Sequence, residues 1–339
     1  MFKQTLHIST SPHLKRSIGT DDIMRNVVWA LLPTSAFAVF SFGLSVFLLL
    51  MTAVVAAVLT EHVLCRLSGQ QSTVDDWSAV ITGLLLGLTL PPAFPLWMAF
   101  VGSVIAIALG KFAFGGLGYN TFNPALVGRA VLQAAFPVAI TTWHPAFLDG
   151  RFSNIPSSTL ALPFMEPHYD AISGATPLSA FKFDQVTTSS ADLAMGLVSG
   201  SAGETCAVLI LLGGIYLIAR KMMNWRIPVA LLLTVYILSG IVHWFDPAAY
   251  PSPSFMLFSG GLMLGAIFMA TDMVASPLTP SGAVLYGVLI GLLVVVIRLW
   301  GGLPEGVMYA ILLANAISPH IDKALQPRVY GTVKKSKAA

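Results

Sequence analysis

Charged residues are scarce in this sequence. Asp, Glu, Lys and Arg together account for 10% of the 339 residues, whereas hydrophobic residues account for 56% and the mean hydropathy is +0.80. A soluble domain requires a more charged surface, so the composition excludes that class and predicts an integral membrane protein. The formal net charge of +3 is too small to suggest a nucleic-acid partner.

Cysteine is nearly absent as well. Cys65 and Cys206 stand alone, and the seven histidines are scattered without the spacing of metal ligands. The sequence also lacks a glycine-rich nucleotide-binding fingerprint. We therefore predict no metal ligands and interpret both cysteines as packing residues. Any redox chemistry would then need an organic cofactor or a partner subunit.

Long apolar runs are present, whereas the short alternating segments of a transmembrane barrel are missing. We therefore predict an all-α membrane protein with about ten spanning helices. No short apolar core with a cleavage site follows the polar first 25 residues, so we expect the first span to act as its own insertion signal. The predicted spans are about 26–41, 44–62, 78–90, 95–110, 124–141, 203–219, 227–243, 255–270, 282–297 and 304–319.

The third and eighth predicted spans are short or discontinuous and rich in glycine. Thr82–Gly87 resembles Gly260–Gly265, and each half continues with a full helix, a Gly-Gly-Leu hairpin and an asparagine, Asn123 or Asn315. This order predicts an internal duplication with five spans in each half. Because five is an odd number, the second half enters the membrane from the opposite side, and the two repeats are inverted.

Lysine and arginine are distributed unevenly between the two faces. With the N-terminus inside, only Arg151, Lys182 and Arg298 of the 18 basic residues fall outside, so we expect both termini to be cytoplasmic. The predicted division is a cytoplasmic N-terminal segment (1–25), a first five-helix repeat (26–141), an outer-face loop (142–202), a second five-helix repeat (203–319) and a basic cytoplasmic tail (320–339).

The outer loop contains the sequence Asp-Ala-Ile-Ser-Gly-Ala-Thr-Pro at residues 170–177. Long loops that are ordered usually carry function. The small residues before Thr176 would let the active site of another macromolecule approach its hydroxyl, and Pro177 stiffens the chain after it. A plain Gly-Ala turn ended by proline explains the same residues.

Ser-Gly-Ala-Thr in an outer loop between two five-helix halves resembles the D subunit of the Rnf ion-translocating electron-transport complex. The B subunit of the sodium-pumping NADH:quinone reductase is a close relative within the same family. The resemblance covers nearly the whole chain, and its further motifs lie at 11–13, 115–124, 270–272, 298–306 and 312–315.

The resemblance implies a covalent flavin. Residues 170–176 fit the flavinylation signature of the family, which implies that Thr176 carries FMN through a phosphodiester. A dedicated FMN transferase that uses FAD would install it. Asp170, Ser173, Gly174 and Ala175 would be recognised by that transferase, and none of these residues is predicted to be catalytic.

Three further residues are weaker candidates for cofactor binding. Arg129 stands in the fifth span where relatives would have a neutral residue, and we favour anchoring at the membrane interface over holding a flavin phosphate or a partner's carboxylate. Asn120 and Asn123 precede the helix that Pro124 opens, where free amides could bind an anion or a flavin edge. A simple capping turn explains them equally well.

Short glycine-rich spans in matching positions also predict a second site in the membrane. The resemblance implies a non-covalent riboflavin or a quinone-like ligand there. We place it in the region of Gly83, Gly87, Gly261, Gly265 and Asp272. Close packing of helices through small residues explains the same glycines without a ligand. Asp272 is the best acidic candidate for an ion path, although an ordinary helix-terminal carboxylate is the simpler interpretation.

The function implied by the resemblance is that of a flavin-carrying redox subunit in the bacterial cytoplasmic (inner) membrane. It would belong to a complex that couples ferredoxin–NAD electron transfer to Na⁺ or H⁺ translocation, with iron–sulfur and second flavin subunits as partners and no complete active site on this chain. The quinone-reductase B subunit is the alternative, although its longer N-terminal extension is missing here. A urea-channel-like transporter is a third interpretation, but a channel has no need for the motif at 170–176.

Overall fold

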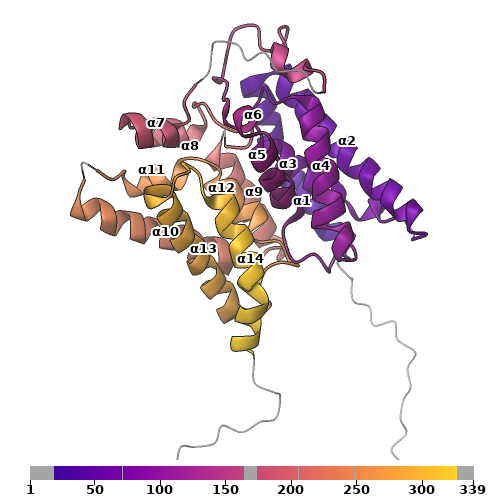
Figure 1. The fold of residues 1–339 in the computed structure, drawn as a ribbon. Coiled ribbons are helices and arrows are strands. Elements are labelled where there is room, and N and C mark those ends of the chain that lie inside the picture. The colour runs from indigo at the N-terminus through magenta and orange to yellow at the C-terminus, as the bar shows by residue number, and fades with distance from the viewer. Residues whose placement is uncertain (1–18, 71, 164–173, 205, 248, 327–339) are drawn as a thin grey trace, which may run out of the picture.

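The computed structural model describes residues 19–70, 72–163, 174–204, 206–247 and 249–326. All regular elements in these ranges are helices (Figure 1), so the predicted all-α class is confirmed. Five helices are long and apolar enough to cross a membrane, namely α1 (Thr20–Phe42), α2 (Leu44–Leu67), α4 (Leu96–Gly110) with its 3₁₀ extension to Phe114, α10 (Arg226–Phe245) and α13 (Pro280–Trp300).

The third predicted span is a continuous but short helix, α3 (Ser78–Thr89). Its 12 residues rise about 18 Å, well below the roughly 30 Å of a hydrocarbon core. Pro91 and Pro92 end it because proline disfavours helical backbone before it. A Cβ atom on Gly83 would lie 2.6 Å from Val54 Cα, and one on Gly87 would lie 2.8 Å from a Leu50 methyl group. Both glycines are therefore packing residues that bring α3 against α2.

The eighth predicted span is broken into pieces. It consists of α11 (Pro253–Phe258), a turn at 259–261, α12 (Leu262–Leu264) and the π-helical turn η4 (Gly265–Met269). Gly260 has a φ of 65°, which a residue with a side chain rarely adopts. A π-helical turn inside a helix is uncommon and is frequently found at functional sites. The predicted discontinuity of this span is confirmed.

Other helices lie in the segments 26–141 and 203–319, which were predicted as repeats and are called the first and second halves, although the last helix runs on to Ala324. The first half ends with α5 (Pro124–Ala135) and α6 (Pro137–Thr141), and the second contains α9 (Ala207–Ala219) and α14 (Val307–Ala324). Helix α1 packs against α9, and α5 packs against α14 and α3, so the halves are joined through these helices. Leu85, Leu86 and Leu88 of α3 belong to the same continuous hydrophobic core as residues 266–269 of η4.

The segment predicted as an outer loop contains short helices. These are η3 (Ser157–Leu160), α7 (Pro177–Asp184) and α8 (Ser190–Met195), and Figure 1 shows α7 and α8 at the edge of the molecule beside α11. Beyond α8 the chain turns into the core. Its backbone N–H groups at Ala202 and Gly203 donate to the carbonyl oxygens of Leu90 and Leu88 at 3.1 and 2.6 Å. This return loop therefore caps the free C-terminal end of α3.

Candidate functional site

Thr176 is the N-terminal cap of α7. Its hydroxyl accepts from the backbone N–H of Ser179 at 3.3 Å and lies 2.8 Å from the Ser179 hydroxyl. Thr176 is only 8% exposed, although Ala175 beside it is exposed. The expectation that another macromolecule could approach this hydroxyl freely is therefore wrong for the folded state. Asp170 and Ser173 lie outside the described residues.

Gly174 shows how the chain reaches Thr176. Its N–H donates to the carbonyl oxygen of Trp143 at 2.9 Å, and a Cβ atom on it would lie 2.5 Å from the Ser199 hydroxyl. The glycine is therefore needed for close packing on both sides. This packing role holds whether or not a transferase also recognises the residue.

A cavity of about 560 Å³ lies beside Thr176. This volume is within the range of small-molecule and cofactor sites. Two aromatic residues, Trp143 and Phe183, lie in its wall, and three charged residues, Arg129, Glu204 and Glu305, line it as well. The other lining residues are Gln133, Ile140, Thr141, Gly174, Ala175, Leu178, Ser179, Gly260, Leu303, Pro304 and Met308.

Arg129 is buried in the wall of this cavity and is 8% exposed. Its Nη2 atom lies 2.8 Å from Glu305 Oε2, whereas its Nε atom is buried and has no hydrogen-bond partner among the described residues. Anchoring at the membrane interface, the favoured interpretation, was wrong. The reason is that α5 packs tightly on α4, since a Cβ atom on Gly128 would lie 2.7 Å from the Gly102 carbonyl oxygen. The guanidinium is paired with Glu305 in the wall of this cavity and does not lie at the membrane interface.

Glu305 connects Arg129 to the broken eighth span. Its Oε1 atom accepts a hydrogen bond of 2.6 Å from the backbone N–H of Gly261. Burial acts to raise its pKa, but the charges of Arg129 and Arg298 outweigh that effect and hold the pKa below its usual range. Glu305 lies in the connection before α14, outside the spanning helices, so an ionised carboxylate is stable there.

Glu204 is the second carboxylate of the cavity and lies in the return loop before α9. It is 9% exposed. Burial, together with the negative charge of Glu305, raises the pKa of Glu204 to about 7. The two carboxylates of this cavity thus differ in character, since Glu305 is held ionised and Glu204 can change its protonation near neutral pH.

Arg298 stabilises the break in the eighth span. It is 4% exposed, and its two terminal nitrogens donate to the carbonyl oxygens of Met256 at 2.6 Å and Ser259 at 2.9 Å. These carbonyls are left without helical partners where α11 ends. A side chain from the end of α13 therefore supplies the hydrogen bonds that the interrupted helix lacks.

Asn120 and Asn123 lie at a different cavity, lined in part by Ser78, Lys111 and Asp272. Asn123 caps α5, accepting from Ala125 N at 3.0 Å, and its amide donates to the Met269 carbonyl oxygen at 3.3 Å. The capping interpretation of Asn123 is confirmed, and the structure separates both asparagines from Arg129 and Thr176. This second cavity is lined by residues of both short spans, but of the five residues around which a second site was predicted only Asp272 lines it. Its volume of about 90 Å³ holds a few water molecules but not a flavin ring.

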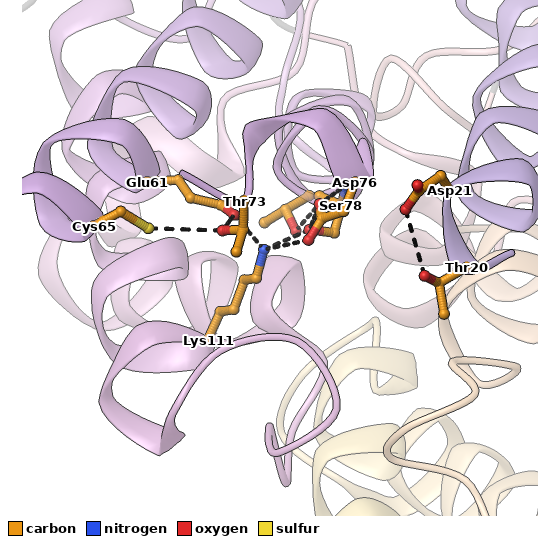
Figure 2. Close-up of polar contacts among 9 residues, drawn as sticks. Thr20, Asp21, Glu61, Cys65, Thr73, Asp76, Ser78 and Lys111 are labelled. Atoms are coloured by element: carbon orange, nitrogen blue, oxygen red, sulfur yellow. Dashed lines mark hydrogen bonds and ion pairs between the residues drawn. The ribbon is translucent and has the colours of Figure 1, made fainter. Parts of the chain in front are cut away.

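A buried ionic cluster that the sequence analysis missed lies at the N-terminal end of α3 (Figure 2). Lys111 Nζ is 2.7 Å from Glu61 Oε1 and 3.6 Å from Asp76 Oδ2, and it also donates to the Ser78 hydroxyl. Lys111 and Glu61 are 3% and 2% exposed. A glutamate inside the second predicted span was the available signal, because an ionisable residue within apolar sequence needs a partner.

Lys111 and Arg298 occupy comparable places in the two halves. Each stands at the end of a long helix, α4 or α13, shortly before a Gly-Gly-Leu hairpin. Lys111 bonds to the first residue of α3, and Arg298 bonds to the break between α11 and α12. Each cation thus stabilises the short or broken helix of its own half.

Comparison with known proteins identifies the family. The model of the NQR2, RnfD, RnfE family matches residues 7–331. The D subunit of the proton-translocating ferredoxin:NAD(+) oxidoreductase complex of Clostridium ljungdahlii is 40% identical, over 97% of this chain and 97% of the relative. The D subunit of the Na(+)-translocating ferredoxin:NAD(+) oxidoreductase complex of Acetobacterium woodii is 41% identical, over 100% and 99%. The chain therefore belongs to the NQR2, RnfD, RnfE family.

Proposed function

We propose that this chain is the flavin-carrying membrane subunit of an ion-translocating ferredoxin:NAD⁺ oxidoreductase complex, with FMN attached to Thr176 through a phosphodiester. The full-length similarity to D subunits of such complexes supports the first part. One observation carries the second part. Thr176, the last residue of the flavinylation signature, lies at a cavity of cofactor size that contains a buried arginine.

The residues around Thr176 fit the chemistry of FMN. The unpaired Arg129 Nε is a donor for a flavin oxygen or phosphate, and Trp143 and Phe183 offer apolar faces for the ring. The phosphodiester would lie at the N-terminus of α7, where the helix dipole favours negative charge. When bound, the flavin supplies the electron transfer, while these residues position it and exclude water.

Attachment requires a separate transferase and FAD. The Thr176 oxygen forms a bond to the phosphorus of the FMN portion of FAD, the bond from that phosphorus to AMP breaks, and AMP leaves. The hydroxyl proton passes to a base of the transferase, because an unassisted threonine hydroxyl is a weak nucleophile. No oxidation or reduction takes place in this step.

Intact mass is the direct test of the proposed attachment. The wild-type chain, co-expressed with an FMN transferase, should gain one FMN and fluoresce in a denaturing gel, whereas Thr176→Ala should do neither. Thr176→Ala also removes the cap of α7, which costs about 1 kcal/mol. Thr176→Ser is the matched control, since it keeps both cap and hydroxyl and should retain partial modification. An unmodified wild-type chain would refute the proposal.

The proposed topology is two inverted five-helix repeats with both termini in the cytoplasm. The comparable roles of Lys111 and Arg298 support the repeat, and the excess of basic residues on one face supports the orientation. Cysteine labelling can test it. A cysteine for labelling must stand at an exposed position. Ser158 in the predicted outer loop is buried and donates to the Ala93 carbonyl oxygen, whereas Leu162 in the same loop is 64% exposed and Gln70 is exposed. An impermeant maleimide should label Leu162→Cys in intact cells and Gln70→Cys only after permeabilisation, and the reverse pattern would overturn the orientation.

The proposed route of electrons involves partner subunits. A flavin at the outer face is separated from cytoplasmic ferredoxin by about 30 Å of hydrocarbon. The chain has only two cysteines, too few for a four-thiolate cluster, so an iron–sulfur centre that carries electrons across would belong to a partner. This subunit would then contribute the flavin on Thr176 that receives these electrons at the outer face.

A further inference from the structure

Thr176 is closed off in the folded protein, which conflicts with its modification by another enzyme. It is 8% exposed, and its hydroxyl is engaged with Ser179. The next two residues, Pro177 and Leu178, are buried as well. A transferase must bring its active site to within bonding distance of the Thr176 oxygen. In the docked conformation of α7, only the small exposed part of Thr176 that lines the cavity is open to it.

Helix α7 is held to the rest of the protein by two kinds of contact. One is a small apolar cluster of Leu178, Leu193 and Phe255, in which the Phe181 and Phe255 rings are 5.7 Å apart. A Cβ atom on Gly260 would lie 2.7 Å from a Leu178 methyl group, so this contact depends on the glycine turn of the eighth span. The cluster is small because α7 lies at the edge of the molecule (Figure 1).

The other contact is made by Lys182. Its ammonium group donates to three backbone carbonyl oxygens at the end of α13 and in the following hairpin, those of Arg298 at 3.3 Å, Gly301 at 2.5 Å and Leu303 at 3.0 Å. A helix C-terminus carries partial negative charge and unpaired carbonyls, so it attracts a cation. The three hydrogen-bonding positions of one ammonium group are thus all directed at a different part of the chain.

We infer that flavinylation takes place on an undocked α7, and that Lys182 is the latch that docks this helix and returns Thr176 to the cavity. The inference rests on the proposed attachment of FMN to Thr176. Undocking exposes Thr176 and the Gly-Ala segment before it. Docking then seats Lys182 on the α13 terminus and places residue 176 beside Arg129 and Trp143. Lys182 is a positioning residue, since it contacts the chain and not the cofactor.

Thiol labelling measures the opening without any flavin. Thr176→Cys, in the full chain purified in detergent, should react slowly with a maleimide because its position is buried, and the wild type with its buried Cys65 and Cys206 is the blank. Adding Lys182→Met should speed labelling by about tenfold, the change expected when charge-assisted hydrogen bonds are lost and opening is in rapid equilibrium. Lys182→Arg, which can still donate to the carbonyls, should stay close to the parent rate.

Two controls keep the result specific. Leu162→Cys is exposed and lies outside α7, so its labelling rate should not change with Lys182→Met. Leu178→Ala loosens the apolar cluster without touching the latch and should also speed labelling at Thr176→Cys. If Lys182→Met fails to fold, Leu178→Ala still tests whether weaker docking of α7 exposes residue 176. Fast labelling of Thr176→Cys in the parent, or equal rates in the parent, Lys182→Met and Leu178→Ala backgrounds, would overturn the inference.

Flavinylation itself gives the second measurement. With purified FMN transferase and FAD, Lys182→Met and Leu178→Ala should raise the initial rate on Thr176 by a similar factor and leave the final stoichiometry unchanged. If the wild type is flavinylated and neither variant changes the rate, the role of Lys182 as a latch is contradicted while Thr176 is still supported as the attachment site. If the labelling rate of Thr176→Cys changes as expected but the wild-type chain never accepts FMN, the proposed function is contradicted while the role of Lys182 in docking α7 is still supported.

Discussion

Breaking the Arg129–Glu305 ion pair is the sharpest perturbation that the structure offers. The pair joins α5 of the first half to the connection before α14 of the second, at 2.8 Å, with side chains 10% and 19% exposed. Arg129→Met keeps the length and apolar stem of the side chain but leaves the Glu305 carboxylate in the cavity wall without its closest cation. Removing one partner of a buried pair costs about 3–5 kcal/mol.

The lower end of that range applies here. Arg298 remains near Glu305, and Gly261 N–H still donates to Oε1 at 2.6 Å, so the carboxylate keeps part of its stabilisation. An unfolding entropy of roughly 2.1 cal/mol/K per residue amounts to about 0.7 kcal/mol/K for 339 residues. A loss of about 3 kcal/mol therefore lowers the Tm by about 4 °C, and by more where helices persist in the unfolded state.

The assay is thermal unfolding of the detergent-solubilised chain. Arg129→Met and Glu305→Gln should each lower the Tm, and the double variant should recover part of the loss because neither member of the pair is left facing an unpaired partner, although Arg298 still loses the charge of Glu305. Arg25→Met is the matched control, since Arg25 pairs with Asp22 at 3.6 Å with both side chains more than half exposed. Such a pair is worth at most about 1 kcal/mol. A Tm for Arg129→Met equal to that of Arg25→Met would refute the buried-pair reasoning and restore interfacial anchoring.

Two further outcomes are expected. Because the pKa of Glu204 is raised from its ordinary value of 4.5 to about 7, the folded state binds more protons than the unfolded state between these values, so stability should fall as pH rises through that window. Tm measured from pH 5 to 8 should fall less steeply in Glu204→Gln, and parallel curves would contradict the assignment. Gly265→Ala should lower the Tm and slow flavin oxidation in the assembled complex while Thr176 stays flavinylated, since its Cβ would lie 2.5 Å from a Val307 methyl group. Gly302→Ala, which meets nothing within 4 Å, should change neither property.

The sequence could predict those features that depend on local composition. Apolar runs predicted the five helices that are long and apolar enough to span a membrane, and proline and glycine predicted where the third span ends and the eighth is interrupted. The motif at 170–176 pointed to Thr176 without any knowledge of the fold. The predictions of helices and of their interruptions succeed because hydrophobicity and backbone freedom are properties of neighbouring residues, whereas the attachment of FMN to Thr176 stays a prediction.

The sequence could not predict which distant residues meet. Arg129 and Glu305 are 176 positions apart and come from different halves, so neither suggested the other. The position of Arg129 near the start of its span favoured snorkelling, but α5 is only 12 residues long and packed into the protein interior. Thr176 was expected to be accessible because its neighbours are small, yet small neighbours also allow close packing. Gly174 is pressed against Ser199 for that reason.

The segment from Arg298 to Glu305 links three parts of the protein that the sequence treats as separate. The Arg298 guanidinium donates to a carbonyl oxygen at the end of α11. The carbonyl oxygens of Arg298 and of the hairpin accept hydrogen bonds from Lys182 of α7. The Glu305 carboxylate accepts from Arg129 on α5 and from the Gly261 N–H in the broken span. Each of these contacts uses a different atom of one short hairpin. A displacement of the hairpin would therefore disturb contacts of α7, of the interrupted eighth span and of Arg129 at the same time. This shared hairpin would let a change at the proposed flavin site reach the broken eighth span without a long chain of intermediates.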